Sequence, residues 1–292
     1  MQRKQKISII ILHIVLILGA CIMILPFLWM VLTSLKTVSE STSMNPFIFF
    51  PKVLQWENYK TVIQQNDFIR LYFNTFVMMI LRVLCAVVFS AMAAYAFARL
   101  DFPGKNILFG LVLFQMMVPA QIFVIPQYLM VDKMGMKNTV FALVFPGLVS
   151  AFGTFLMRQF FMGLPKELEE SARLDGCDDI RVLVNMVLPL SKSILAVLVL
   201  YYAIAHWNSY FDAFIYLSSE NKFTLQVVLR NIMNSVAALE EMATTAEQSM
   251  RAANIEVLKY AIIVFGSIPL IILYPFVQKH FVKGVMIGSV KG

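Results

Sequence analysis

The stretch ISIIILHIVLILGACIMILPFLWMVLT, from Ile7 to Thr33, contains no Lys, Arg, Asp or Glu. An α-helix rises about 1.5 Å per residue, so about 20 mostly apolar residues cross a hydrocarbon layer roughly 30 Å thick. The stretch is therefore long enough to span a membrane. It is longer than the apolar core of a signal peptide, and it continues through Pro26 and Trp29 without a small-x-small cleavage site. We expect an uncleaved first span.

Five further apolar stretches follow along the chain. They predict spans at residues 71–98, 107–131, 139–157, 193–217 and 260–277. Hydrophobic residues make up 60% of the sequence and charged residues only 14%, which is far from the composition of a soluble globular protein. The sequence therefore predicts an all-α membrane protein with about six transmembrane helices.

The basic residues indicate the orientation of these spans, because Lys and Arg accumulate in short cytoplasmic loops. They gather before the first span, between the second and third, between the fourth and fifth, and after the sixth: Arg3, Lys4, Lys6, Arg99, Lys105, Arg158, Lys166, Arg173, Arg181, Lys192, Lys279, Lys283 and Lys291. This pattern predicts a multi-pass protein with both termini in the cytoplasm, and topology accounts for the net charge of +7. No basic, aromatic-interleaved soluble domain is present, so we expect no nucleic-acid partner.

Cysteines and histidines are scattered rather than clustered. They are Cys21, Cys85, Cys177, His13, His206 and His280. No disulfide framework, paired metal-ligand spacing or convergent catalytic set is visible, so we expect neither a metal site nor catalytic residues.

The segment GLPKELEESARLDGCDDIRVLVNMVLPLS, residues 163–191, joins the fourth and fifth spans. Pro165 suits the first turn of a helix, and Gly176 is placed to stop that helix in a left-handed conformation. This pattern predicts a short helix that ends at a glycine turn.

A second short helix is expected to follow the turn. Asp178 and Asp179 favour a helix N-terminus through capping and the macrodipole, and Pro189 closes the stretch. In the first helix we expect Glu167 and Glu169 simply to solvate the loop, whereas Glu170 could pair with a basic residue of a partner.

The same segment resembles the EAA motif of ABC importer permeases, in which E-A-A, three residues, Gly, nine residues and I-x-L-P follow in order. Here the pattern stands as Glu170, Ser171, Ala172, Gly176 and the run MVLP at 186–189, with the family's frequent Asp as Asp175. The departures, Ser171 for Ala and Met186 for Ile, are mild in size.

The resemblance implies a type I ABC importer permease fold in which residues 163–189 supply the coupling helix. It also implies that Glu170, Ser171, Ala172, Asp175 and Gly176 contact an ATP-binding subunit. The expected domains are a first span with an outer loop (1–69), a permease core (70–278) and a cytoplasmic tail (279–292). The implied partners are a second homologous permease, a dimer of ATP-binding subunits, an extracytoplasmic solute-binding protein and membrane lipid.

Resemblance extends through WNSYFDAF at 207–214 and FVKGVMIGSVKG at 281–292, which look like carbohydrate-uptake permeases similar to the maltose-system subunit. The oligosaccharide and aldouronate branch is the closest likeness. It implies an oligosaccharide substrate and a bacterial plasma or inner membrane. The chain contains no GxxxxGK[ST] phosphate loop, so we expect it to bind no cofactor and the partner ATPase to use ATP and Mg.

Aromatic faces pack on sugar rings, and hydroxyl and amide groups bond to sugar hydroxyls. Candidate pathway residues are therefore Tyr201, Tyr202, His206, Trp207, Asn208, Tyr210 and Gln121. For Trp207 and Tyr210 a place in the interfacial aromatic belt is an equal alternative. Arg82 lies deep in the second span, where it could clamp neighbouring helix carbonyls or contact substrate.

An ion-coupled secondary transporter is the alternative function. Such carriers place carboxylates inside the bundle, whereas the predicted spans hold only Asp212, near the outer end of the fifth. A membrane enzyme would need a catalytic set that the sequence does not show.

Overall fold

The computed structural model describes residues 2–41, 49–65, 67–242 and 254–272. These residues form helices and connecting turns with no strand among them, which confirms the all-α fold. They belong to two compact units, described separately below. The first unit comprises Met1–Phe68 and Val228–Ile268, and the second comprises Ile69–Val227 and Pro269–Gly292.

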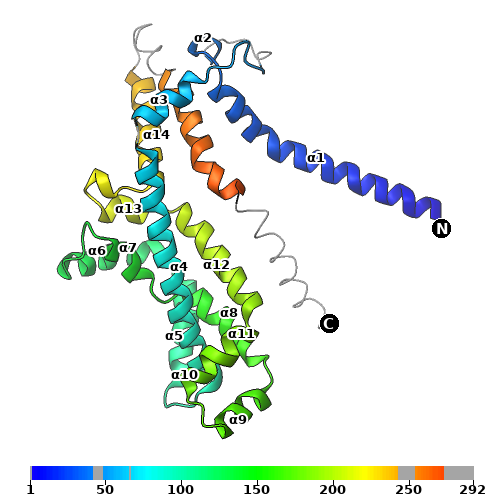
Figure 1. The fold of residues 1–292 in the computed structure, drawn as a ribbon, viewed down its shortest axis with the longest axis vertical. Helices are drawn as coiled ribbons and strands as arrows, with labels where there is room; N and C mark the ends of the chain where they lie inside the picture. Colours follow the sequence, from blue (N-terminus) through cyan, green and yellow to red (C-terminus); the bar gives the residue numbers. More distant parts are fainter. Residues whose placement is uncertain (1, 42–48, 66, 243–253, 273–292) are drawn as a thin grey trace. The chain divides into compact units, whose positions relative to one another are not determined.

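The first unit contains the longest apolar helix (Figure 1). Its elements are α1 (Gln2–Ser34), α2 (Val38–Ser41), α3 (Glu57–Gln65), most of α14 (Leu225–Met242) and the helix Asn254–Ile272. The end of α1 is tied to α3, because the Asn58 side-chain amide donates to the carbonyl oxygens of Ser34 (2.9 Å) and Lys36 (3.1 Å). Side chains in the middle of α1 are exposed in the isolated chain, and Met23 is 83% exposed. This is expected of a surface that faces lipid.

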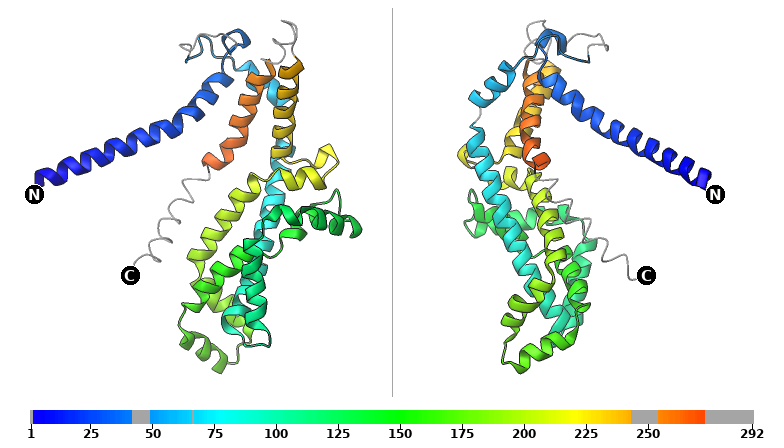
Figure 2. Two further views of the ribbon diagram at one scale, coloured as in Figure 1. Left: turned by 180° about the vertical axis from the view of Figure 1, so that it is seen from behind. Right: turned by 45° about the vertical axis from the view of Figure 1, so that its right-hand side comes forward.

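The second unit is organised around the long helix α4. Its elements are α4 (Phe68–Arg99), α5 (Lys105–Met117), η1 (Ala120–Phe123), α6 (Val124–Lys133), α7 (Val140–Val144), η2 (Phe145–Gly147), α8 (Ala151–Met162), α9 (Lys166–Leu174), α10 (Asp179–Val182), η3 (Leu183–Val187), α11 (Leu188–Leu190), α12 (Lys192–Trp207), α13 (Phe211–Tyr216) and η4 (Glu220–Lys222). One core cluster joins α4 to α8, α10, η3 and α12, and Figure 2 shows α8 and α12 beside α4. A second cluster joins α4 to α6, α7 and α13.

The described residues contain up to six candidate membrane spans by length and composition, in agreement with the expected number. Three helices are long and apolar enough alone: Ser8–Ser34, Phe68–Arg99 and Asn254–Ile272. Three helix pairs pass the same test together but are bent, by 104° at the end of α5, by 47° before α8 and by 84° before α12. Residues 273–277 of the sixth predicted span, and the tail 279–292, lie outside the described residues.

Prolines account for two of the bends but not for all of the kinks that their positions predict. Pro119 stands at the break after α5, and Pro146 lies in η2 before the bend at α8. Pro126 does not break α6, because it occupies the first turn, where its missing N–H would have had no partner. The helix Asn254–Ile272 continues through Pro269.

The fifth span ends earlier than the sequence predicts. Helix α12 stops at Trp207, where the Asn208 side-chain amide donates back to the Ile204 carbonyl oxygen at 3.0 Å. Chain 208–210 then leads into the separate helix α13. Local side-chain capping of this kind competes with helix continuation, and hydropathy does not register it.

The chain after the fifth predicted span also contains a long helix, α14. Helix α14 is amphipathic, with Leu225 and Val227 fully buried and Arg230 exposed. Its start is held to α4 by the Leu225 N–H, which donates to the buried Thr75 hydroxyl at 3.0 Å.

Candidate functional site

The segment with the EAA spacing forms a helix, a glycine turn and a second helix, as predicted. Helix α9 begins after Pro165 and ends at Leu174, and Gly176 adopts a left-handed φ of 84°. The Cys177 N–H then reaches back to the Ala172 carbonyl oxygen at 3.0 Å, and this bond satisfies one of the last carbonyls of the helix.

Helix α10 begins as the sequence indicates. Asp178 is its N-cap, and the Asp178 carboxylate accepts a hydrogen bond of 2.8 Å from the Arg181 N–H. The helical path then continues through a π-helical turn and past Pro189 to Leu190, so the break comes at Ser191, two residues later than predicted.

Helix α9 presents two unlike faces. Glu170, Ser171 and Asp175 are exposed, together with Leu174, which is 89% exposed. Ala172 instead packs inward among buried residues of α4, α8 and η3. Of the five residues expected to contact a partner subunit, Ala172 is thus the one whose side chain packs into the core of this chain.

Glu169 does not solvate the loop, contrary to the sequence-based expectation. Its side chain is only 10% exposed and lies 2.7 Å from Nε of Arg99, whose side chain is 5% exposed. Arg99 also donates through Nη2 to the carbonyl oxygens of Phe161 and Leu164, both at 2.7 Å. Glu169 is buried because Arg99, far away in sequence, supplies the compensating charge. The pair joins the end of α4 to α8 and α9.

A second ion pair braces the loop itself. The Arg173 guanidinium on α9 contacts the Asp179 carboxylate on α10. Partial burial works to lower the pKa of Arg173, but the charges of Asp179 and Tyr95 act in the opposite direction and raise it. Arg173 therefore stays charged and helps to fix the angle between the two short helices.

Arg82 pairs with a carboxylate rather than with helix carbonyls. Its Nη2 lies 2.7 Å from Oδ2 of Asp212 on α13, and the two side chains are 14% and 37% exposed. The Arg82 Nε is buried without a hydrogen-bond partner. His206 on α12 lies within electrostatic range of both groups. Neither alternative drawn from the sequence, a clamp on helix carbonyls or a substrate contact, included this pairing, because Asp212 comes from a separate helix whose position hydropathy could not give.

The aromatic candidates on α12 divide into packed and open residues. Trp207 is fully buried and meets the ring of Phe76 edge-on at 5.0 Å, so it belongs neither to an interfacial belt nor to an open surface of this chain. Tyr202 is 5% exposed, whereas Tyr201 is 53% exposed. Asn208 and Gln121 are also exposed, and His206 and Tyr210 are half-buried.

Tyr202 is held against α8 by the lack of a side chain at Gly153. A Cβ on Gly153 would stand 2.0 Å from the Tyr202 hydroxyl oxygen. Ser90 of α4 receives the Ser150 N–H at 3.0 Å next to this contact. These small and polar residues bring three helices close together at the bend before α8.

The part of the chain that the structure describes contains no group of three His, Cys, Asp or Glu residues that could hold a metal ion. Sequence reasoning missed Arg99 and Glu169 as site residues. The sequence shows a glutamate directly before the EAA glutamate and an arginine at the end of the second span. Nothing in the sequence indicated that these two residues form an ion pair.

Comparisons with known proteins agree with this geometry. Residues 86–287 match the family model described as "Binding-protein-dependent transport system inner membrane component". The chain is 36% identical to Protein LplC of Bacillus subtilis, over 95% of this chain and 93% of that protein. It is 32% identical to the polygalacturonan/rhamnogalacturonan transport system permease protein YtcP of the same organism, over 99% and 100% of the two chains.

A solved structure shares the fold as well. It is the crystal structure of a bacterial ABC transporter involved in the import of the acidic polysaccharide alginate. One of its chains superposes with a TM-score of 0.81 and 28% identity, over 96% of this chain and 98% of that chain.

Proposed function

Because this chain belongs to the family of binding-protein-dependent transport system inner membrane components, we propose that it is the permease subunit of an ATP-driven importer of oligosaccharides. The observation that carries the proposal is the α9–α10 segment: its EAA-spaced residues form a helix at one end of the second unit (Figure 1), and a buried ion pair anchors that helix to α4.

The coupling step rests on what α9 and α10 expose. Glu170, Ser171 and Asp175 offer polar contacts, and Leu174 and Ile180 add apolar side chains that are 89% and 68% exposed. A small surface of this kind suits a groove on a soluble partner, since exposed apolar groups with polar neighbours gain from burial. The partner would be one subunit of an ATP-binding dimer, which uses ATP and Mg.

The buried Arg99–Glu169 pair gives that contact a mechanical consequence. A push on α9 passes to α4 and α8 through Arg99, which holds Glu169 and the carbonyl oxygens of Phe161 and Leu164 together. Closure of the ATPase dimer would thereby reorient the spans and open the cavity outward, as alternating access requires. A second homologous permease and an extracytoplasmic solute-binding protein complete the proposed assembly, and both termini of this chain would lie in the cytoplasm.

The substrate class is supported by the relatives, which include an arabinooligosaccharides transport system permease protein, AraQ of Bacillus subtilis, at 29% identity. Tyr201, Asn208 and Gln121 are the open residues among the proposed pathway groups. Tyr202 is buried and His206 and Tyr210 are half-buried, so movement of α12 would be needed to bring them into the path. Trp207 would hold α12 against α4.

Ion coupling has no support in the site. Asp212 was the one carboxylate that a secondary transporter could have used within the predicted spans, and the Arg82 charge compensates it at 2.7 Å.

Reconstitution tests the proposal. Proteoliposomes holding the chain with its partner permease, ATPase and binding protein should take up a labelled oligosaccharide when ATP is present and fail when ATP is omitted. Uptake driven by a proton or sodium gradient without ATP would overturn the assignment. A panel of arabino-, galacturono- and xylo-oligosaccharides then identifies the substrate.

A further inference from the structure

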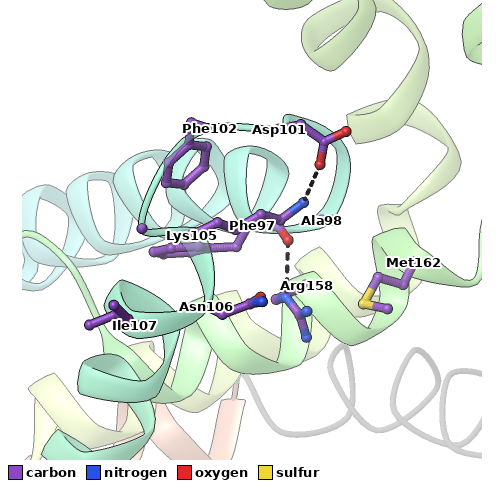
Figure 3. A pocket seen from close by; sticks show the side chains of 10 residues that line it. Phe97, Ala98, Asp101, Phe102, Lys105, Asn106, Ile107, Arg158 and Met162 are labelled. Carbon is purple, nitrogen blue, oxygen red and sulfur yellow. Dashed lines mark hydrogen bonds and ion pairs between the residues drawn. The ribbon is translucent and has the colours of Figure 1, made fainter.

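A cavity of about 640 Å³ lies where three spans end. Phe97 comes from the last turn of α4, Lys105 and Asn106 begin α5, and Arg158 and Met162 lie in the last turns of α8 (Figure 3). Helix α4 is a candidate span, and α5 and α8 each form one half of a bent candidate span, so their ends here mark the boundary between hydrocarbon and water. The cavity therefore opens at the level of lipid headgroups.

The cavity carries a net positive charge. Arg158 is fixed by its Nε, which donates to the Phe97 carbonyl oxygen at 3.1 Å, and its guanidinium carbon lies 4.0 Å from the centre of the Phe109 ring. Among the described residues no carboxylate forms an ion pair with Arg158. Lys105 contacts Asp101 at 3.3 Å, but Asp101 is fully exposed, so water screens that pair. Two cations and one carboxylate line the cavity.

The backbone adds a further donor site. Gly104 turns the chain with a left-handed φ of 81°, and no side chain caps the N-terminus of α5. The Lys105 N–H already donates to the Phe102 carbonyl oxygen at 3.3 Å, but the positive end of the helix dipole still favours an anion beside the two cations.

Apolar side chains continue from the cavity along the helices. Ile107 is 73% exposed, Phe114 is 62% exposed and Met162 is 50% exposed. A soluble phosphate would gain nothing from these surfaces, whereas the acyl chains of a lipid would cover them.

We propose that this cavity binds the phosphate headgroup of an anionic glycerophospholipid. Arg158 and Lys105 would hold the phosphate oxygens, and the acyl chains would lie along α5 and α8. Basic pockets between span ends are suited to such headgroups. The inference rests on membrane residence and does not depend on the identity of the transported sugar.

Native mass spectrometry of the full-length chain, purified from bacterial membranes in detergent, tests the site. The probes are phosphatidylglycerol, phosphatidylcholine and inorganic phosphate. The unmodified protein should retain phosphatidylglycerol in preference to phosphatidylcholine. Lys105→Gln and Arg158→Gln should each reduce that retention about fivefold, the effect expected of one basic residue near an anionic surface.

Matched variants separate charge from packing. Lys105→Arg and Arg158→Lys keep the charge and should keep most of the lipid. Arg181→Gln removes an exposed charge on α10, outside the cavity, and should change nothing. Equal retention of the two lipids, or a loss in Arg181→Gln as large as in Arg158→Gln, would overturn the proposal. Displacement of phosphatidylglycerol by millimolar inorganic phosphate would assign the site to a soluble anion instead.

Discussion

Helix α4 carries two arginines that each lie 2.7 Å from a carboxylate, and the surroundings of the two pairs differ. Arg99 and Glu169 have side chains only 5% and 10% exposed, and Arg99 also satisfies two backbone carbonyls. In the Arg82 pair the Asp212 carboxylate is 37% exposed, while in both pairs the arginine Nε lacks a hydrogen bond of good geometry. From this difference in burial we infer that the first pair is a fixed joint beneath the proposed coupling helix and that the second can exchange partners.

Removal of the charge on Glu169 should give the largest effect. Glu169→Gln leaves the Arg99 charge buried without a counter-charge, and loss of one partner of a buried pair costs about 3–5 kcal/mol of folding free energy. The unfolding midpoint of the purified chain in detergent measures this loss. Replacement of both residues by methionine should restore part of the stability, because neither charge is then buried alone, although the Phe161 and Leu164 carbonyl oxygens lose their donor. A double variant no more stable than Glu169→Gln would contradict the buried-pair interpretation.

Asp212→Asn is the matched change in the open pair. Because more than a third of the Asp212 side chain is exposed, water can replace much of the lost contact, and we expect a cost of about 1 kcal/mol. The same unfolding assay compares the two variants directly. If Asp212→Asn is as destabilising as Glu169→Gln, the contrast between a fixed and an exchangeable pair is wrong.

Gly176→Val tests whether the fixed joint serves coupling. No atom lies within 4 Å of a Cβ placed on Gly176, so only the left-handed backbone opposes a side chain, at about 1–2 kcal/mol and more for a branched residue. Substrate-stimulated ATPase activity and uptake should fall together while the chain still inserts. Gly176→Asn is the control, because asparagine tolerates this conformation. Full uptake in Gly176→Val, at normal expression and with the ATPase attached, would remove the case for this loop as the transmission element.

Glu170→Lys should have the smallest effect. Glu170 is exposed, so stability should be unchanged within about 0.5 kcal/mol. Binding of the ATPase should weaken by a few-fold at low salt, because the charge facing the partner is reversed. Glu167→Lys on the same helix is the matched control and should bind nearly as well as the unmodified chain. Equal weakening in both variants would indicate a general effect of charge.

Much of the fold and the local form of the candidate site could be predicted from the sequence. The long apolar runs, the left-handed turn at Gly176 and the cap at Asp178 depend on neighbouring residues, and the structure contains all of them. The end of α12 at Trp207 and the helix α14 were missed, since the first depends on a side-chain cap and the second on contacts with α4. The division into domains at 1–69, 70–278 and 279–292 stays a prediction.

What the sequence determined by itself was therefore residence in the membrane, the approximate number of spans and the helix, turn and second helix of residues 163–191, because hydrophobic length and backbone preference are local properties. Only the tertiary structure decided which charged and aromatic side chains are buried and which residues they contact. Glu169 is buried because Arg99 meets it from another helix, Asp212 pairs with Arg82 because α13 turns away from α12, and Trp207 packs against Phe76 instead of facing an open path. Burial of a charge is tolerable only where a distant residue supplies its partner, and that proximity is a property of the folded chain.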